Sequence, residues 1–502
     1  MSQFKNTFEL EFKDIKWGGE DEAKDDENLD NYFVEFPEFN DIISGYKRYI
    51  IGRKGTGKSA ILQKIRLMAN EDPLLFFEDI SLRDFPFADF KIMEDKSLAN
   101  KSKYIVAWKI LLLLSYIKMM LADESIMNYR AKDELREFIE ENFPNGISIP
   151  ETIRQIKDNN NKLSVKTLPF LSGETANKRS VTLDGKVHFN ALEKELELIL
   201  QKAKSNESTY FLLIDELDEG YKRENERQNS VIMSLLRATE EISRFFRSNS
   251  IKCYPILALR EDIFDSLEDN DLNKLDDYIL RLNWSAEDGG AWSLKNIVEK
   301  RIGASIKSKY GNLISSLDYW GLVTEENNTG KDLWSYICAL TFCRPRDIVK
   351  IMKYCKNTKG RLTLDDIHAI ENNYSQWLYN EFRDEVQSFL SCWKNVLNCL
   401  TEIAEGKAEI DLLKERLEND EIVKNWCEKN KKNADYIINL LFNYSVIGQV
   451  NKKGHWIFKY KDNAIEYMSS YPYYCVHYGF CRKLRIPKKY DKTIVNVLTN
   501  SD

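Results

Sequence analysis

The sequence predicts an α/β fold over the first 285 residues, with a parallel sheet and helices on both of its faces. Short, continuously apolar segments alternate there with segments of helical periodicity, as expected for strands that are buried on both faces. After about residue 286 the strand signals stop, which indicates that a helical region follows. The predicted strands are residues 46–51, 73–80, 210–214, 253–259 and 278–284.

The composition is that of a folded protein without an excess of positive charge. Apolar residues are 43% and charged residues 30% of the 502, so the chain is not mainly disordered. The net charge is −7, with 73 Lys and Arg against 80 Asp and Glu, which excludes a globally basic nucleic-acid-binding surface. The most apolar stretch, residues 105–122, contains Lys109 and Lys118, so we expect a buried helix and no membrane span.

The cysteines and histidines predict neither a disulfide framework nor a metal site. Nine cysteines occur without a CxxC pair, and the N-terminus lacks the apolar core of a signal peptide. We therefore expect a cytoplasmic protein with reduced thiols. The four histidines are far apart in the sequence, which does not support a zinc site.

We expect four regions along the chain. An acidic N-terminal arm, residues 1–34, is expected to be solvated. The α/β core follows at 35–285, with a helical and loop-rich insertion at about 85–190. A helical region at 286–385 and a C-terminal module at 386–502 complete the chain.

The segment after the first predicted strand fits the phosphate-loop pattern G-x-x-x-x-G-K-[ST] in full. Glycines let the backbone curl so that several N–H groups point at one phosphate, and the helix predicted at 59–69 adds its N-terminal donors. Lys58 would contact the β and γ phosphates of a bound nucleotide, and the Ser59 hydroxyl would complete a Mg²⁺ shell. The residues expected to bind the nucleotide are Gly52, Arg53, Lys54, Gly55, Thr56, Gly57, Lys58, Ser59 and Ala60.

Acidic residues follow the apolar strand at 210–214, at the edge where an open α/β sheet places its ligands. Asp215 would hold Mg²⁺ through a water, and Glu216 would orient or deprotonate the attacking water. Asp218 is the alternative base. The two motifs therefore predict a bound nucleoside triphosphate with Mg²⁺, and hydrolysis of its γ-phosphate as the reaction.

These two motifs, together with Leu259-Arg260 at the end of a later strand, resemble the AAA+ superclass of P-loop ATPases, and more narrowly its origin-recognition-like and STAND branches. The resemblance implies that the nucleotide is ATP, that the reaction is ATP hydrolysis, and that Arg260 contacts the γ-phosphate as a sensor. It implies that Arg346, with Arg344 as the alternate, reaches the nucleotide from a helical lid at 286–385. Lys274 occupies roughly the place of a finger offered to a neighbouring subunit. The simpler alternatives are Arg260 paired with Glu261 or Asp262, surface arginines at a helix cap, and a solvated lysine.

The layout as a whole resembles the FunZ-type bacterial P-loop ATPases. The interval from Lys58 to Asp215 is much longer than in a minimal AAA+ core, so an insertion must be accommodated. The resemblance is carried by WGGEDEAKDD, IIGRKGTGKSAI, LLIDELDEG, LREDIF, NKLDDYILRLNW, FCRPRDIVKIM and VHYGFCRKL, which occur in patches along most of the chain.

The C-terminal module is predicted to contain helices followed by a two-strand ribbon, which resembles a winged helix. The ribbon is expected to turn at residues 451–454 and to return at 456–460. Its basic residues could contact DNA phosphates, but acidic residues in the same module leave a protein contact open. The basic residues are Lys452, Lys453, His455, Lys459, Arg482, Lys483, Arg485, Lys488, Lys489 and Lys492.

We expect one of two functions from these features. The first is a nucleotide-controlled switch, in which ATP closes the lid and exposes a surface for self-assembly or for a partner protein. Family analogy connects such a switch with bacterial signalling or antiviral defence. The second is a DNA-associated ATPase that binds duplex through its winged helix. A small-molecule kinase, the third hypothesis, leaves the C-terminal module without a purpose.

Overall fold

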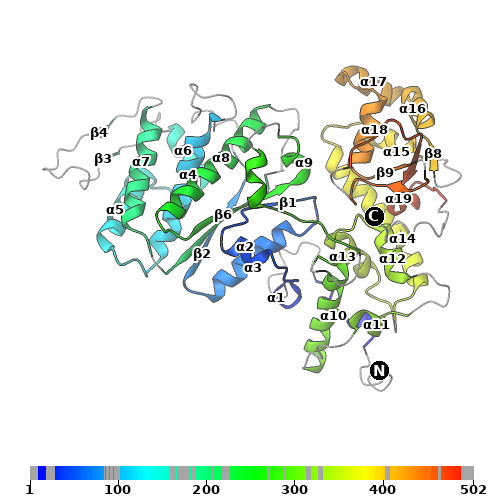
Figure 1. Ribbon diagram of the computed structural model, residues 1–502, viewed down its shortest axis with the longest axis horizontal. Helices are drawn as coiled ribbons and strands as arrows, with labels where there is room; N and C mark the ends of the chain where they lie inside the picture. The colour runs from blue at the N-terminus through cyan, green and yellow to red at the C-terminus, as the bar shows by residue number, and fades with distance from the viewer. Residues whose placement is uncertain are drawn as a thin grey trace. The chain divides into compact units, whose positions relative to one another are not determined.

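The computed structural model describes residues 10–487 with several gaps, and Figure 1 shows how its helices and strands are arranged. The gaps are residues 19–28, 84, 86–89, 91–93, 95–101, 159–164, 167–179, 182–186, 206, 218–225, 268–271, 287–289, 291, 312–317, 326–331, 402–406, 452 and 462–464.

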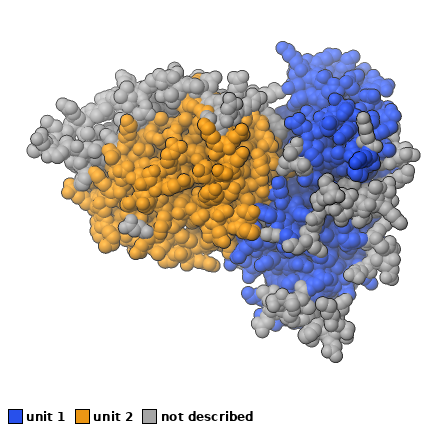
Figure 2. Space-filling model, in the orientation of Figure 1, with its two compact units in different colours: residues 1–36, 283–502 blue, residues 37–282 orange. Residues whose placement is uncertain are grey.

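Contacts along the chain divide it into two compact units, which Figure 2 shows in different colours. Unit 2 is residues 37–282, and unit 1 joins residues 1–36 to residues 283–502. Each unit has a large hydrophobic core of its own.

A five-stranded, all-parallel sheet forms the centre of unit 2 and confirms the predicted α/β fold. Its strand order is β2-β5-β6-β1-β7, so β6 lies between β1 and β5. All five predicted strands are present, and their ends differ from the prediction by a few residues. The strands are β1 (Tyr49–Gly52), β2 (Leu75–Ser81), β5 (Thr209–Asp215), β6 (Cys253–Arg260) and β7 (Ile279–Arg281).

Helices cover the two faces of this sheet (Figure 1). Helix α3 (Lys58–Glu71) packs on β1, β2 and β6, while α4 (Ile105–Ala122) packs on β2 and β5 together with its neighbours α7 (Val187–Lys202) and α8 (Glu226–Ser248). Among the described residues, α4 alone is long and apolar enough to cross a membrane, but 72% of it is buried inside the protein. It packs as a core helix, as its two internal lysines predicted.

The insertion between β2 and β5 contains more helix than the sequence indicated. Helix α5 (Tyr129–Asn142) follows α4, and α6 (Ile149–Asp158) lies in a stretch that was expected to be loop. The short strands β3 (Val165–Lys166) and β4 (Ser180–Val181) pair with each other. Unit 2 also contains three short elements outside the insertion: α2 (Phe39–Ile43), α9 (Glu261–Phe264) and the 3-10 segment Leu272–Tyr278.

The N-terminal segment packs into unit 1 where it is described. Leu10, Phe12 and Trp17 are buried in the core of unit 1, so this part of the expected arm is packed and not solvated. Most of the acidic run of the arm lies outside the described residues. Phe36, the last residue before unit 2, packs against Trp292 with 4.4 Å between ring centroids, so both chain segments that lead to unit 2 meet in unit 1.

Residues 292–386 are helical, as predicted. Local sequence signals define several helix starts: the side chains of Ser293 and Asp332 cap α10 and α12, Thr363 forms a capping box with Asp366, and Pro345 occupies the first turn of α13. The helices are α10 (Leu294–Tyr310), α11 (Tyr319–Val323), α12 (Leu333–Leu340), α13 (Pro345–Tyr354) and α14 (Leu364–Val386).

The C-terminal module combines helices with an antiparallel sheet of order β10-β9-β11-β8. The predicted ribbon is present, since Val450 of β9 pairs with Trp456 of β10 across the expected turn. Two further strands, β8 and β11, had no clear sequence signal. The elements are α15 (Trp393–Asn398), β8 (Lys407–Glu409), α16 (Ile410–Asn419), α17 (Glu421–Asn430), α18 (Ala434–Asn443), β9 (Ile447–Val450), β10 (Trp456–Ile457), β11 (Tyr473–Val476) and α19 (Tyr478–Cys481).

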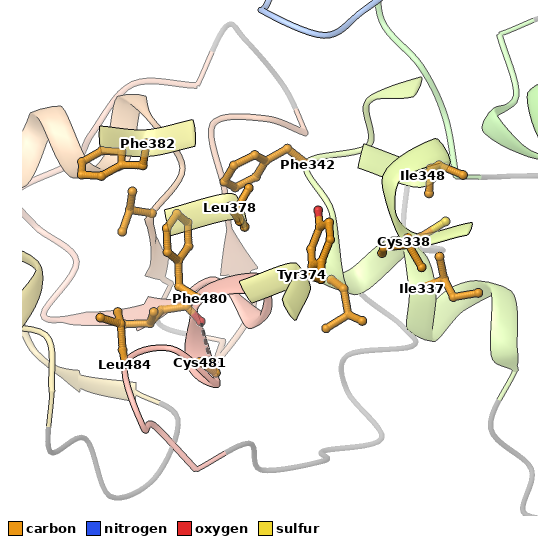
Figure 3. Packing of buried hydrophobic residues seen from close by; sticks show 14 of the residues in the cluster. Ile337, Cys338, Phe342, Ile348, Tyr374, Leu378, Phe382, Phe480, Cys481 and Leu484 are labelled. Atoms are coloured by element: carbon orange, nitrogen blue, oxygen red, sulfur yellow. Dashed lines mark hydrogen bonds between the residues drawn. The ribbon is translucent and has the colours of Figure 1, made fainter. Parts of the chain in front are cut away.

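Helix α19 fastens this module to the helical region of unit 1. Phe480 lies among Phe342, Leu378 and Phe382 (Figure 3). A Cβ on Gly479 would lie 2.5 Å from the Leu340 carbonyl oxygen, so only glycine permits this close approach. The two predicted regions of unit 1 therefore share one core.

Candidate functional site

The glycine-rich loop connects the carboxyl end of β1 to the start of α3. Gly55 and Gly57 have φ values of +84° and +96°, in the left-handed region that favours glycine. A Cβ on Gly52 would lie 2.5 Å from the Thr56 hydroxyl, which itself donates to the Arg53 carbonyl oxygen. The loop is thus a tight curl that presents the N-terminus of a 14-residue helix.

Lys58 and Ser59 are the first two residues of α3 and point to different partners. The Lys58 ammonium donates to the carbonyl oxygens of Gly52 and Arg53, at 2.9 and 3.1 Å, and so lies against the loop. The Ser59 hydroxyl donates to the Asp215 carboxylate at 2.9 Å. The two predicted motifs, 156 residues apart in sequence, therefore meet at one edge of the sheet.

Glu216, the predicted base, is held by two residues that the sequence analysis did not identify. Its carboxylate accepts hydrogen bonds from the Ser81 hydroxyl and from the Arg83 guanidinium, the latter at 2.7 Å. Ser81 is the last residue of β2 and lies opposite Asp215 in the register of β2 and β5. The pairing of β2 with β5 places Ser81 and Arg83 next to Glu216. Neither residue belongs to a local sequence motif that predicts this contact.

The backbone at Glu216 is also unusual. Its φ of 63° lies in the left-handed region, which costs a non-glycine residue on the order of 1 kcal/mol or more. Its N–H donates to the Asp215 carboxylate at 2.8 Å, so Asp215 joins Ser59 to the turn after β5. The alternative base, Asp218, lies outside the described residues.

Arg260 ends β6, directly opposite Gly52 in the register of β1 and β6. Its guanidinium forms a two-pronged ion pair with Asp262, at 2.8 and 2.9 Å, which was the simpler of the two expectations for this residue. Burial raises the pKa of the neighbouring Glu261, and the Asp265 carboxylate raises it further, while Arg281 and Arg53 act in the opposite sense. Charged side chains from β6, β7 and the loop thus gather at this edge.

The arginines predicted to reach the nucleotide from unit 1 differ in their surroundings. Arg344 is buried and pairs with the fully buried Asp347, whose carboxylate also accepts the Phe342 N–H. Arg346 is partly exposed and pairs with Glu381 of α14 at 3.1 Å. Arg344 is therefore held in a buried ion pair, whereas Arg346 is held in a partly exposed one.

Lys274, the predicted finger, lies in the 3-10 segment before β7 and is exposed. The described residues contain no group of three or more His, Cys, Asp or Glu side chains that could hold a metal ion. Protein ligands for Mg²⁺ at this edge would accordingly be few, and the Ser59 hydroxyl and Asp215 carboxylate are the ones that lie together.

Two comparisons with known proteins bear on the chain. The sequence model of the FunZ-associated C-terminal helical domain matches residues 292–383, which confirms the predicted FunZ resemblance for the helical region. A curated protein of Escherichia coli (strain K12), named "Putative transposon gamma-delta 80.3 kDa protein", is 22% identical over 343 residues. That alignment covers 66% of this chain and 46% of the relative, so the chain spans less than half of the relative's length.

The two arginines before α13 should respond very differently to substitution. We expect Arg344→Met to lower the free energy of unfolding of unit 1 by about 3–5 kcal/mol, because it leaves the Asp347 carboxylate buried without its cation. Arg346→Ala, which breaks a partly exposed pair, should cost less than about 1 kcal/mol. Urea unfolding followed by tryptophan fluorescence measures both, and equal losses would contradict the assignment of Arg344 to the core.

Proposed function

We propose that this protein is a Mg²⁺-dependent ATPase, a P-loop NTPase of the AAA+ superclass, whose nucleotide state controls its contacts. One observation carries the proposal. The Ser59 hydroxyl, on a helix that begins in a left-handed glycine, meets the Asp215 carboxylate at the carboxyl ends of two parallel strands. Open α/β sheets bind their ligands at this edge.

The residues of the loop fit a triphosphate. Gly55 and Gly57 keep side chains away from the curl, and α3 supplies N-terminal N–H donors and the positive end of its dipole. Lys58 lies against the loop carbonyls and would exchange them for phosphate oxygens, which are stronger acceptors for an ammonium group. Gly52, Arg53, Lys54, Thr56 and Ala60 complete the proposed nucleotide contact.

Ser59 and Asp215 fit a Mg²⁺ ion that keeps much of its water. Mg²⁺ prefers six oxygen ligands and is usually held by one or two protein groups together with phosphates and waters. A hydroxyl and a carboxylate within hydrogen-bond distance of each other match this pattern. When bound, the ion would neutralise charge on the phosphates.

Glu216 and Arg260 would act on the attacking water and on the γ-phosphate, respectively. Glu216 would accept a proton from the attacking water, which requires its carboxylate to leave Arg83. Arg260 lies on the strand between β1 and β5 and would donate to the γ-phosphate after exchanging Asp262 for it. Asp218 remains the alternative base.

The remaining features support a switch more than a metabolic enzyme. Residues 292–383 match a helical domain associated with FunZ, and we propose that this region is the lid, with Arg346 as its nucleotide contact. The C-terminal helices and antiparallel sheet are proposed to be a winged-helix variant fastened to the lid by α19. ATP binding would then move both together and expose a surface for self-assembly or a partner protein, in a cytoplasmic role in signalling or antiviral defence.

A DNA-associated ATPase is the alternative, and the name of the Escherichia coli relative, which refers to a transposon, favours it. The turn between β9 and β10 exposes Lys453 and His455, which could contact phosphates. Arg482, however, is paired with the buried Glu371 of α14. Lys452, Lys488, Lys489 and Lys492 lie outside the described residues.

Two substitutions test the ATPase proposal. We expect Lys58→Ala to weaken Mg·ATP binding by about 30- to 160-fold, because charge-assisted hydrogen bonds contribute about 2–3 kcal/mol. Glu216→Gln should keep nucleotide affinity while turnover falls by about 10²–10⁴, the usual contribution of a general base. Calorimetry and steady-state phosphate release measure the two effects. Absence of Mg·ATP binding by the unaltered chain would refute the proposal, and normal turnover in Glu216→Gln would transfer the base to Asp218.

Arg83 should restrain Glu216. We expect Arg83→Ala to raise basal ATP turnover a few-fold without changing nucleotide affinity, since a half-exposed ion pair contributes up to about 1 kcal/mol. Arg66→Ala is a suitable control, because Arg66 pairs with Asp79 near the same end of β2 but does not touch Glu216. A fall in turnover in Arg83→Ala would mean that Arg83 positions Glu216 for catalysis.

One set of measurements separates the switch from the DNA-associated ATPase. For a switch, we expect the mass of the full chain in solution to increase with Mg²⁺ and a non-hydrolysable ATP analogue and to stay monomeric with ADP. For the alternative, duplex DNA should stimulate turnover, and its binding should weaken steeply with salt. A monomer in both nucleotide states, together with DNA stimulation, would favour the alternative.

A further inference from the structure

We propose that unit 2 contains a second ligand site, a pocket that binds a small aromatic anion of about the size of a mononucleotide. The pocket has a volume of about 540 Å³ and lies between α8, the start of α4 and the 3-10 segment Leu272–Tyr278. Ligand sites of small organic molecules have volumes of roughly 300–1,000 Å³. This pocket is independent of the proposed nucleotide loop.

Hydrogen bonds place the pocket at the amino ends of the strands, opposite the carboxyl ends where the glycine-rich loop lies. The Tyr49 hydroxyl, at the start of β1, donates to the Leu236 carbonyl oxygen at 3.2 Å. The Arg48 N–H donates to the Tyr278 carbonyl oxygen at 2.9 Å, just before β7 begins. Leu236 and Tyr278 line the pocket, which therefore lies at the amino ends of β1 and β7. The glycine-rich loop, by contrast, begins at Gly52, the residue at the carboxyl end of β1.

The floor of the pocket is apolar. One face of α8 supplies Met233 and Leu236, the start of α4 supplies Ile105, and the 3-10 segment supplies Leu272 and Leu275. Leu236 and Leu275 also belong to the core of unit 2, so the floor is rigidly supported. Such a floor favours a ligand with a flat apolar body, because each Å² of apolar area removed from water contributes about 25 cal/mol.

The charged residues of the pocket favour an anion. Arg237, Arg244 and Lys274 line it together with two carboxylates, Glu240 and Glu241. Both carboxylates already have positively charged partners that do not line the pocket. Glu240 accepts from the Tyr49 hydroxyl at 2.8 Å and pairs with the Arg48 guanidinium at 3.6 Å.

Glu241 belongs to a different charge cluster, which is centred on Lys109. Lys109 of α4 lies 3.1 Å from Glu241 and also pairs with Glu193 and Glu197 of α7. Glu241 is therefore partly neutralised by a cation that it shares. The net charge of the lining residues is positive, and Arg244 and Lys274 are both exposed at the rim, where an anionic group would be met first.

The buried Arg48 adds a positive charge next to the pocket through its ion pair with Glu240. It is 1% exposed, and its guanidinium stacks on the Tyr278 ring at 3.9 Å. Among the described residues, its Nε and one terminal nitrogen have no hydrogen-bond partner. Arg48 is not among the residues that line the pocket, but it offsets part of the charge of Glu240, which is.

A dye-binding experiment on the full-length protein tests the proposal. The probe is anilinonaphthalene sulfonate, an aromatic anion that becomes fluorescent when it binds, and its neutral congener is N-phenylnaphthylamine. We expect one saturable site per chain and at least about tenfold weaker binding of the neutral congener. AMP should displace the dye, whereas inorganic phosphate at the same concentration should not. Equal binding of the neutral congener, or equal displacement by phosphate, would overturn the proposal.

Substitutions locate the site. We expect Arg244→Glu combined with Lys274→Glu to weaken dye binding at least about tenfold, and the corresponding double substitution to Gln to weaken it less. Arg247→Glu is the matched control, since Arg247 is exposed on the same helix but does not line the pocket. Full affinity in the Gln and Glu variants, or an equal loss in Arg247→Glu, would overturn the assignment.

The proposed nucleotide loop is tested in the same assay. Lys58→Ala should leave dye binding and its displacement by AMP unchanged, because Lys58 is at the opposite edge of the sheet. A loss of dye binding in Lys58→Ala would place the dye at the loop and overturn the second site. Failure of the ATPase proposal, by contrast, would leave dye binding intact.

Discussion

The contact between the Ser59 hydroxyl and the Asp215 carboxylate is the interaction on which the candidate site depends. It requires three features at once: a curl of glycines at the end of β1, a helix that starts immediately after it, and a strand β5 that ends at the same edge. A parallel sheet provides that shared edge, because the carboxyl ends of all its strands point the same way. Strand β6 lies between the two partners and places Arg260 in the same row.

Asp215 also organises the residue that follows it. Its carboxylate accepts the Glu216 N–H as well as the Ser59 hydroxyl, which helps to stabilise the left-handed backbone at Glu216. In that conformation the Glu216 side chain reaches Ser81 and Arg83 at the end of β2. Under the proposed function, the Glu216 carboxylate would have to leave Arg83 before it accepts a proton, and release of this ion pair becomes a step that can be regulated.

Much of the fold could be predicted from local sequence. The five apolar segments became the five strands, and the two lysines within residues 105–122 indicated a core helix correctly, since Lys109 pairs with Glu193 and Lys118 with Glu78. The meeting of Ser59 with Asp215 followed from the two motifs and the parallel sheet. Helix α6 was missed because its segment is rich in polar residues. Arg344 and Arg346 could not be distinguished by spacing, because burial beside Asp347 depends on how α13 packs.

The sequence by itself determined the strand-loop-helix order, the glycines of the curl and the position of the acidic pair after an apolar strand, because each of these is a local property of the backbone. Only the tertiary structure decided which side chains surround them. The strand order β2-β5-β6-β1-β7 brings Ser81 and Arg83 to Glu216. Helix α8 and the 3-10 segment Leu272–Tyr278 together line the pocket that is proposed as a second ligand site. Both arrangements depend on contacts between separate segments of the chain, and the residue pattern within one segment cannot predict such contacts.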